Sequence, residues 1–189
     1  GGSDEFRGRG GPLKVTDPDG RDPLFQSLIA AAQETGIPHV RDYNGVSQEG
    51  ISMSQATIAN GKRVSTAYSY LNPVKYRSNL EIVTGALTTR LIIEGKRCRG
   101  VYFSRGDAAH IAHADAEVIV SAGSINSPAL LELSGIGQPD RLQAIGIEVR
   151  HPLPGVGENL RDHYAPRTRW AIDTPRVAFN HRAKSFGLA

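Results

Sequence analysis

The second half of the chain alternates between short apolar runs and glycine-containing turns. Runs of β-branched and other apolar residues predict strands over Leu80–Val83, Leu87–Glu94 and Cys98–Ser104. The turn at Glu94–Arg97 favours a hairpin between the last two of them. The same criterion predicts further strands at His110–Ala114, Glu117–Ser121, Gly146–Arg150 and Arg167–Ile172.

The first half of the chain is richer in loop and turn residues. Asp22 before Pro23, followed by apolar residues at helical spacing, predicts a helix that ends at Gly36. The polar segment Ile37–Gly61 indicates loops, and Ser65–Tyr70 a second short helix. Strand and helix patterns together place the chain in the α/β class.

Residues 118–137 combine a strand, a tight turn through Gly123 and a helix. We expect Pro128 in the first helical turn with Ser127 as the N-cap, and Gly135 ends the helix. In doubly wound α/β folds, a turn with glycine between a strand and the following helix holds the phosphate groups of a dinucleotide. A helical turn is also expected over Asp140–Ile145.

The composition of the 189 residues is that of an ordinary globular protein, with a net charge of +3. No apolar run reaches the ~20 residues that span a bilayer, so no membrane span is expected. The basic residues are not interleaved with aromatic ones, which are only 6% of the chain, so we expect no nucleic-acid partner. Because no signal-peptide pattern occurs at the N-terminus, we expect a cytoplasmic location.

The stretch Gly123–Gly137 resembles a signature of the glucose-methanol-choline (GMC) oxidoreductases, which are FAD-dependent alcohol oxidases and dehydrogenases. Five other segments match the same family in the same order, closest to its choline-dehydrogenase-like bacterial members. They are Arg9–Leu13, Asp42–Gly50, Asn60–Ala67, Arg77–Leu80 and Pro154–His163. Arg161 stands where Gln is common in the family.

The resemblance implies part of an FAD-binding Rossmann-like domain, a loop-rich insertion and the start of a substrate-binding domain. The expected boundaries are 1–78 for the insertion, 79–163 for the partial FAD-binding domain and 164–189 for the start of the substrate-binding domain. The implied reaction oxidises the CH–OH group of choline or another primary alcohol to an aldehyde. A histidine base takes the hydroxyl proton, flavin N5 takes the hydride, and the electrons pass to an unspecified acceptor.

Two features of that family are missing from this sequence. No G-x-G-x-x-G occurs in it, and none of its six histidines lies in the family's catalytic motif. We therefore assign no catalytic residue and expect a central fragment that is inactive alone. The alternative is a non-catalytic, truncated remnant of such an enzyme, and flavin titration distinguishes the two.

Four residues are candidates for cofactor contacts through the resemblance. Thr88 corresponds to a strand residue whose backbone meets the FAD adenine, and Ser121, Ala122 and Gly123 correspond to a turn near the adenosine half. Gly123 would let the backbone approach the ligand. The alternatives are an ordinary strand position for Thr88 and a tight turn without a ligand for the other three.

Other reactive side chains have simpler explanations. Cys98, the only cysteine, lies between two arginines, but it fits one wall of a hairpin better than a reactive site. His163 is expected to order a loop. His110 and His113 fall in a predicted strand, where they face opposite sides, so no metal site is predicted. Gln48–Gln55 either lines a substrate entrance, by family analogy, or packs as a surface loop.

Overall fold

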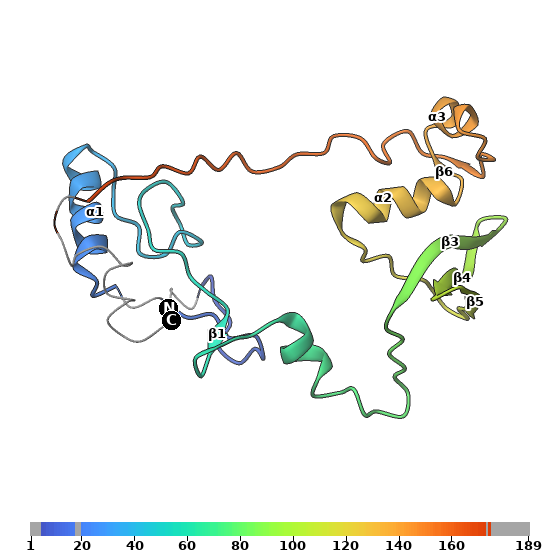
Figure 1. The fold of residues 1–189 in the computed structure, drawn as a ribbon, viewed down its shortest axis with the longest axis horizontal. Coiled ribbons are helices and arrows are strands. Elements are labelled where there is room, and N and C mark those ends of the chain that lie inside the picture. The colour runs from blue at the N-terminus through green and yellow to red at the C-terminus, as the bar shows by residue number, and fades with distance from the viewer. Residues whose placement is uncertain (1–4, 18–19, 173, 175–189) are drawn as a thin grey trace. The chain divides into compact units, whose positions relative to one another are not determined.

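A computed structural model describes residues 5–17, 20–172 and 174 of the chain (Figure 1). The chain forms two compact units, of which the second is Ile82–Pro166 and the first lies on either side of it in sequence. Helices and strands both occur, so the expected α/β class is confirmed. No helix within the described residues is long and apolar enough to cross a membrane.

The first unit contains the helix that the sequence predicts. Helix α1 spans Pro23–Glu34, and the side chain of Asp22 accepts a hydrogen bond from the backbone N–H of Leu24 at 2.9 Å. Pro23 occupies the first helical position, where its missing N–H leaves no backbone group unpaired. The chain turns away from the helix at Gly36, as predicted.

The remainder of the first unit consists mainly of loops with few regular elements. Strands β1 (Ile58–Ala59) and β2 (Lys62–Arg63) pair antiparallel around the turn between them. The predicted short helix is a single π-helical segment, η1 (Ala67–Leu71). Isolated bridges join Thr16 to Ala56 and His39 to Ile51.

The second unit is built on a three-stranded antiparallel sheet. Strands β3 (Ala86–Glu94), β4 (Arg97–Arg105) and β5 (Ala108–His113) follow one another as neighbouring strands (Figure 1). This confirms the hairpin at Glu94–Arg97 and the strand expected near His110. The pairing of β3 with β4 is irregular between Thr88 and Arg90, where one extra residue of β3 is accommodated.

Two helices and a small parallel ladder complete the second unit. Helix α2 spans Gly123–Leu133 and packs against β3, and helix α3 spans Pro139–Ala144. Strands β6 (Ile136–Gly137) and β7 (His151–Pro152) pair in parallel.

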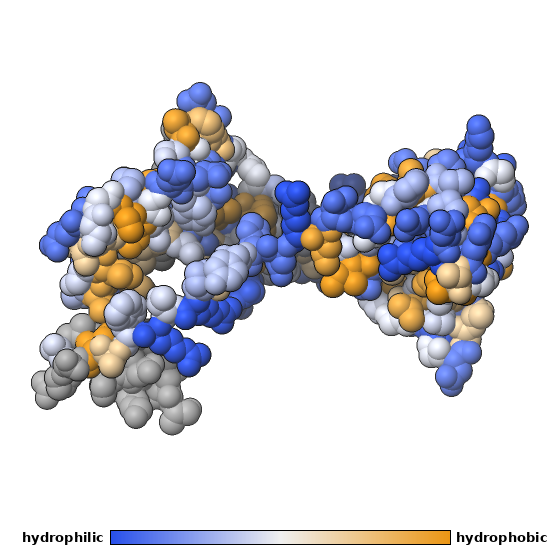
Figure 2. All heavy atoms as spheres, turned by 90° about the horizontal axis from the view of Figure 1, so that it is seen from above, coloured by the Kyte–Doolittle hydropathy of each residue, from blue (hydrophilic) through white to orange (hydrophobic). Residues whose placement is uncertain are grey.

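Few apolar side chains are fully covered in either unit. The buried ones in the second unit are Leu91, Leu130, Leu142 and Val156, which come from β3, α2, α3 and the loop after β7. Many large apolar side chains are exposed, and Figure 2 shows apolar residues at the surface among polar ones. The core of each unit is therefore small for the length of its chain.

Four of the predicted strands are wrong. Leu80–Val83, Glu117–Ser121, Gly146–Arg150 and Arg167–Ile172 form no strand in the structure. The ladder after Gly146–Arg150 begins only at His151. The β-branched pattern reports which residues suit a strand, but a strand also needs a neighbour that accepts its backbone hydrogen bonds.

Helix α2 begins earlier than predicted. It starts at Gly123, so Pro128 lies inside it, and Ser127 is not its N-cap. Instead, the hydroxyl of Ser127 accepts a hydrogen bond from the backbone N–H of Ala122 at 3.1 Å. Pro128 has no N–H to donate to the carbonyl of Ser124, four residues earlier. That carbonyl lies in the exposed first turn of the helix, where water can replace the missing hydrogen bond. The predicted end at Gly135 is confirmed.

Candidate functional site

The turn at Ser121–Gly123 stands at the exposed N-terminus of α2. Gly123 is the first residue of the helix and has φ of +89°, a conformation that favours glycine. No atom of another segment lies within 4 Å of the position that a Cβ would take there. The first backbone N–H groups of the helix are therefore open to a ligand.

Thr88 lies in β3, one of the two edge strands of the antiparallel sheet. It pairs with Phe103 immediately before the irregularity in the ladder. Its side chain is exposed. An edge strand leaves backbone groups on one side without a ladder partner, so a backbone contact to a ligand is compatible with this position.

Ser134 ties the strand of Thr88 to the helix of Gly123. It is only 2% exposed, and its hydroxyl accepts a hydrogen bond from Leu91 N at 2.9 Å and donates one to Leu130 O at 2.6 Å. Both sets of predicted cofactor residues thus belong to elements that are fixed to one another. Sequence reasoning did not single out Ser134, although it lies within the signature.

A groove of about 520 Å³ runs between α2 and the loop after β7. Its walls come from two of the sequence motifs, the signature and the Pro154–His163 segment. Ser124, Ile125 and Pro128 line it from the helix, and Val156 and Leu160 from the loop. The structure therefore brings together two motifs that are separate in the sequence, next to the open turn at Gly123.

Three charged side chains in contact with one another hold the loop after β7 against α2. Arg141 Nε lies 3.6 Å from Glu132 Oε1, and Arg141 Nη1 lies 3.8 Å from Glu158 Oε1. Glu132 Oε1 is buried and has no hydrogen bond within the described part of the chain. Arg141 is thus the cation that compensates it. The spacing of these residues in the sequence gives no signal of this contact.

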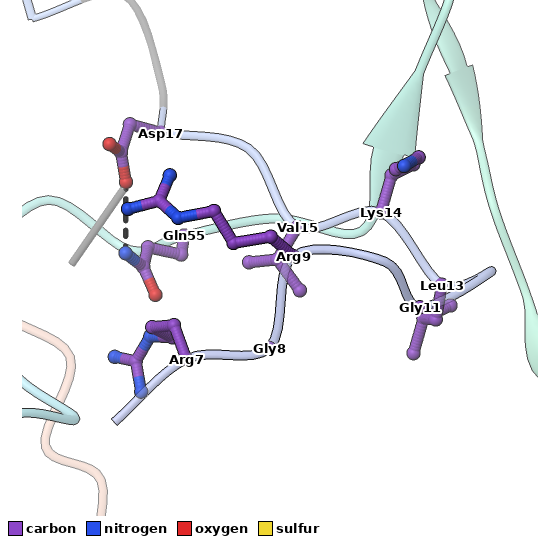
Figure 3. A pocket seen from close by; sticks show the side chains of 9 residues that line it. All are labelled: Arg7, Gly8, Arg9, Gly11, Leu13, Lys14, Val15, Asp17 and Gln55. Carbon is purple, nitrogen blue, oxygen red and sulfur yellow. Dashed lines mark hydrogen bonds between the residues drawn. The ribbon is translucent and has the colours of Figure 1, made fainter. Parts of the chain in front are cut away.

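A second pocket, of about 270 Å³, lies within the first unit (Figure 3). The cations Arg7, Arg9 and Lys14 line it together with Asp17 and Gln55. Figure 3 shows Gln55 and Asp17 pointing toward one another, and Gln55 Nε2 donates a hydrogen bond to Asp17 Oδ1 at 2.9 Å. That hydrogen bond, with the charge of Arg41 as a smaller cause, lowers the pKa of the Asp17 carboxyl.

The Asp42–Gly45 turn is fastened to this pocket. Arg7 forms an ion pair with Asp42 and donates a hydrogen bond from Nη1 to Asn44 O at 3.2 Å. The hydroxyl of Tyr43 accepts a hydrogen bond from Gln55 N at 3.0 Å. The loop Gln48–Gln55, expected either to line an entrance or to pack on the surface, is therefore held to this turn at its Gln55 end.

Among the residues that the structure describes, the other reactive side chains form no further site. His110 stacks on Phe103 with ring centroids 5.1 Å apart, and His113 lies three residues along the same strand, on its other face. Cys98 is half-buried in β4. In residues 5–17, 20–172 and 174, no group of three or more His, Cys, Asp or Glu side chains is arranged to hold a metal ion.

The chain belongs to the GMC oxidoreductase family, whose sequence profile matches residues 4–165. It is 43% identical over 176 residues to an oxygen-dependent choline dehydrogenase of Pectobacterium atrosepticum, covering 92% of this chain and 32% of the relative. It is 44% identical over 172 residues to the enzyme of the same name from Staphylococcus saprophyticus, covering 91% of this chain and 30% of the relative. The chain thus spans about a third of the length of these relatives.

Solved structures agree with the family assignment. An FAD-dependent oxidoreductase from Chaetomium thermophilum superposes with a TM-score of 0.79 and 31% identity, over 85% of this chain and 28% of that one. Pyridoxine 4-oxidase from Mesorbium loti superposes with a TM-score of 0.74 and 34% identity, over 81% and 30%. The resemblance inferred from the motifs is confirmed.

Proposed function

We propose that this chain is part of an FAD-dependent oxidoreductase that acts on the CH–OH group of choline or another primary alcohol. Membership in the GMC oxidoreductase family supports the reaction class. The relatives named as oxygen-dependent choline dehydrogenases, together with a structural neighbour named as an aryl-alcohol oxidase, support an alcohol substrate. The observation that carries the proposal is the open, glycine-led N-terminus of α2 within the family signature.

Four residues would hold the cofactor. The backbone of Ser121, Ala122 and Gly123 would approach the adenosine half of FAD, and the backbone of Thr88 its adenine. The exposed turn and the free space around Gly123 fit a ligand there. The partial positive charge of the helix N-terminus favours an anionic or strongly polar group at this place.

FAD supplies the hydride acceptor in this chemistry. The residues of this chain would bind and orient it, and none of them is assigned to move a proton. Ser134 fixes α2 to β3, and the Glu132–Arg141–Glu158 contacts fix the groove wall. Positioning of this kind lowers the entropy that must be lost before reaction.

We also propose the domain boundaries 1–78, 79–163 and 164–189 for the insertion, the partial FAD-binding domain and the start of the substrate-binding domain.

A cytoplasmic location fits a chain with a single cysteine. Fractionation of cells that express the complete gene, followed by immunoblotting, tests the location. Recovery in a secreted or periplasmic fraction would contradict it.

Titration of the full 189-residue chain with FAD, followed by flavin fluorescence, tests the cofactor site. We expect micromolar binding that Gly123→Leu weakens by about tenfold or more, a loss of ~1.4 kcal/mol. Gly146→Leu is the matched control, since Gly146 also has positive φ and open space but lies after α3. Absence of binding by the wild-type chain would favour the alternative, a non-catalytic remnant.

The FAD-loaded chain is expected to show no turnover with choline or benzyl alcohol. The sequence holds no histidine in the family's catalytic motif, so no base is assigned to take the hydroxyl proton. Oxygen uptake and aldehyde formation are the measurements. Turnover by the purified chain, above that of free FAD, would contradict the assignment of no catalytic residue to this sequence.

A further inference from the structure

Two of the seven asparagines in this chain precede a glycine, and the structure holds them differently. They are Asn44, in the Asp42–Gly45 turn, and Asn60, in the turn between β1 and β2. An asparagine before glycine is open to spontaneous deamidation, because glycine carries no side chain to shield the backbone nitrogen that attacks the side-chain amide. The surroundings of that nitrogen then determine which asparagine reacts.

The backbone nitrogen of Gly45 is hydrogen-bonded and crowded. Its N–H donates to Asp42 O at 3.0 Å, and the N–H of Asn44 donates to Asp42 Oδ1 at 3.2 Å. A Cβ at Gly45 would lie 3.1 Å from Asp42 O and 3.4 Å from Asp42 Oδ2. Arg7 also holds the turn, through its ion pair with Asp42 and its hydrogen bond to Asn44 O. Attack by the Gly45 nitrogen on the Asn44 side chain therefore requires these contacts to break.

The backbone nitrogen of Gly61 meets no such constraint. Within the described residues, the N–H of Gly61 donates no hydrogen bond, and Asn60 and Gly61 are both exposed. Beyond its chain neighbours, no atom lies within 4 Å of the Cβ position at Gly61. The turn joins the two-residue strands β1 and β2, and a hairpin this short opens at little cost in free energy.

We propose that Asn60 is a site of spontaneous deamidation and that the contacts of the Asp42–Gly45 turn protect Asn44. A base such as hydroxide removes the proton of Gly61 N, and this nitrogen attacks Cγ of Asn60. The new N–Cγ bond closes a succinimide ring, and the side-chain nitrogen takes up a proton from water and leaves as ammonia. Water then opens the ring at either carbonyl, which leaves aspartate or isoaspartate at position 60. The reaction needs neither FAD nor an alcohol, so it is independent of the proposed function.

The two products differ in their effect on the hairpin. Asn60 and Gly61 both have positive φ, as in the type I′ turn that Asn-Gly and Asp-Gly favour, so aspartate keeps the turn. In isoaspartate the main chain runs through the side-chain carbon, which lengthens the turn and disturbs the register of β1 with β2. Val64, 4% exposed, follows β2 and donates its N–H to Thr57 O at 2.8 Å, so its hydrogen exchange reports the pairing.

Incubation of the full 189-residue chain at mildly alkaline pH tests the proposal. Trypsin releases residues 42–62 as one peptide that carries both asparagines, so mass spectrometry compares the two within a single fragment. In the folded chain we expect Asn60 to be converted faster than Asn44 by about tenfold or more, because the turn at Asn44 opens at a greater cost in free energy. In concentrated urea the two rates should become similar, since both asparagines then precede a glycine in an unfolded chain.

Two variants make the test specific. Asp42→Ala removes the acceptor of Asn44 N and the ion pair with Arg7, so it should speed the conversion of Asn44 and leave that of Asn60 unchanged. Asn60→Asp supplies the carboxylate without the longer main chain. Hydrogen exchange at Val64 should therefore match the wild type in Asn60→Asp and become faster in the isoaspartate product.

The proposal is overturned if the folded wild-type chain converts Asn44 as fast as Asn60. A preference for Asn60 that persists unchanged in urea would also overturn it, because the flanking sequence rather than the fold would then select the site. An unchanged rate at Asn44 in Asp42→Ala would overturn the protection assigned to the turn.

Discussion

Gly100 occupies a position in β4 where only glycine fits. Its φ is +151°, and a Cβ there would lie 2.1 Å from the backbone oxygen of Ala112 and 3.0 Å from the Cα of His113. Because both atoms belong to the backbone of β5, a side chain would force the two strands apart. The close approach of β4 and β5 therefore depends on this residue.

The substitution Gly100→Ala should lower the free energy of unfolding of the second unit by about 2 to 4 kcal/mol, from the combined clash and backbone strain. Urea unfolding followed by circular dichroism measures the change. Gly106→Ala is the control, because Gly106 also has positive φ but open space around it, and should cost only about 1 kcal/mol. Equal losses would mean that the contact with β5 is not what excludes a side chain.

Ser134 is the second residue on which the site depends. In Ser134→Ala the buried N–H of Leu91 loses its hydrogen-bond partner, which should cost about 1 to 3 kcal/mol. Chemical denaturation measures the loss, with the exposed Ser124→Ala in the same region as the control. An unchanged unfolding midpoint would show that water reaches Leu91 N.

The carboxyl of Asp17 offers a test by pH. The hydrogen bond from Gln55 lowers its pKa from the ordinary value of 3.8, so Gln55→Ala should raise it again. A lowered folded-state pKa stabilises the fold above 3.8 and loses this effect as pH falls through the folded value. NMR titration of Asp17 measures the shift, and Gln48→Ala, elsewhere in the same loop, should leave it unchanged.

At the scale of elements, the stability of α1 depends on the residue that caps its N-terminus. Asp22→Ala should destabilise this helix by about 1 kcal/mol, because the N–H of Leu24 loses its acceptor. Asp22→Asn keeps an acceptor oxygen and should cost much less. Hydrogen exchange of the first helical turn measures both. A similar loss in the two variants would assign the effect to the charge of Asp22 rather than to the cap.

Elements fixed by neighbouring residues were predictable from sequence, and those that need a distant partner were not. The Asp22–Pro23 start of α1 and the β3–β4 hairpin depend on local chemistry, and both predictions are confirmed. Glu117–Ser121 has equally clear strand residues, but it forms no strand, because no other segment of the described chain pairs with it. Likewise, the motifs predicted the α2 turn, whereas the Arg141 contacts arise only when loop and helix meet.

At the scale of the whole molecule, the division into two units has a consequence for proteolysis. The second unit ends at Pro166, and residues 160–172 are exposed and carry no helix or strand. Backbone without hydrogen-bonded neighbours opens at little cost in free energy, whereas paired strands open only with their sheet. Arg161, Arg167 and Arg169 lie in the exposed segment.

Brief digestion with trypsin should therefore cut first at Arg161, Arg167 and Arg169 and leave the β3–β5 sheet intact. Arg97 and Arg105 are internal controls, because they are also exposed but lie at the ends of the paired strand β4. Mass spectrometry of the early fragments identifies the cut sites. First cuts at Arg97 or Arg105 would mean that the sheet opens as readily as the extended segment. The second unit would then lack a stable fold of its own in solution, since its sheet is what α2 packs against.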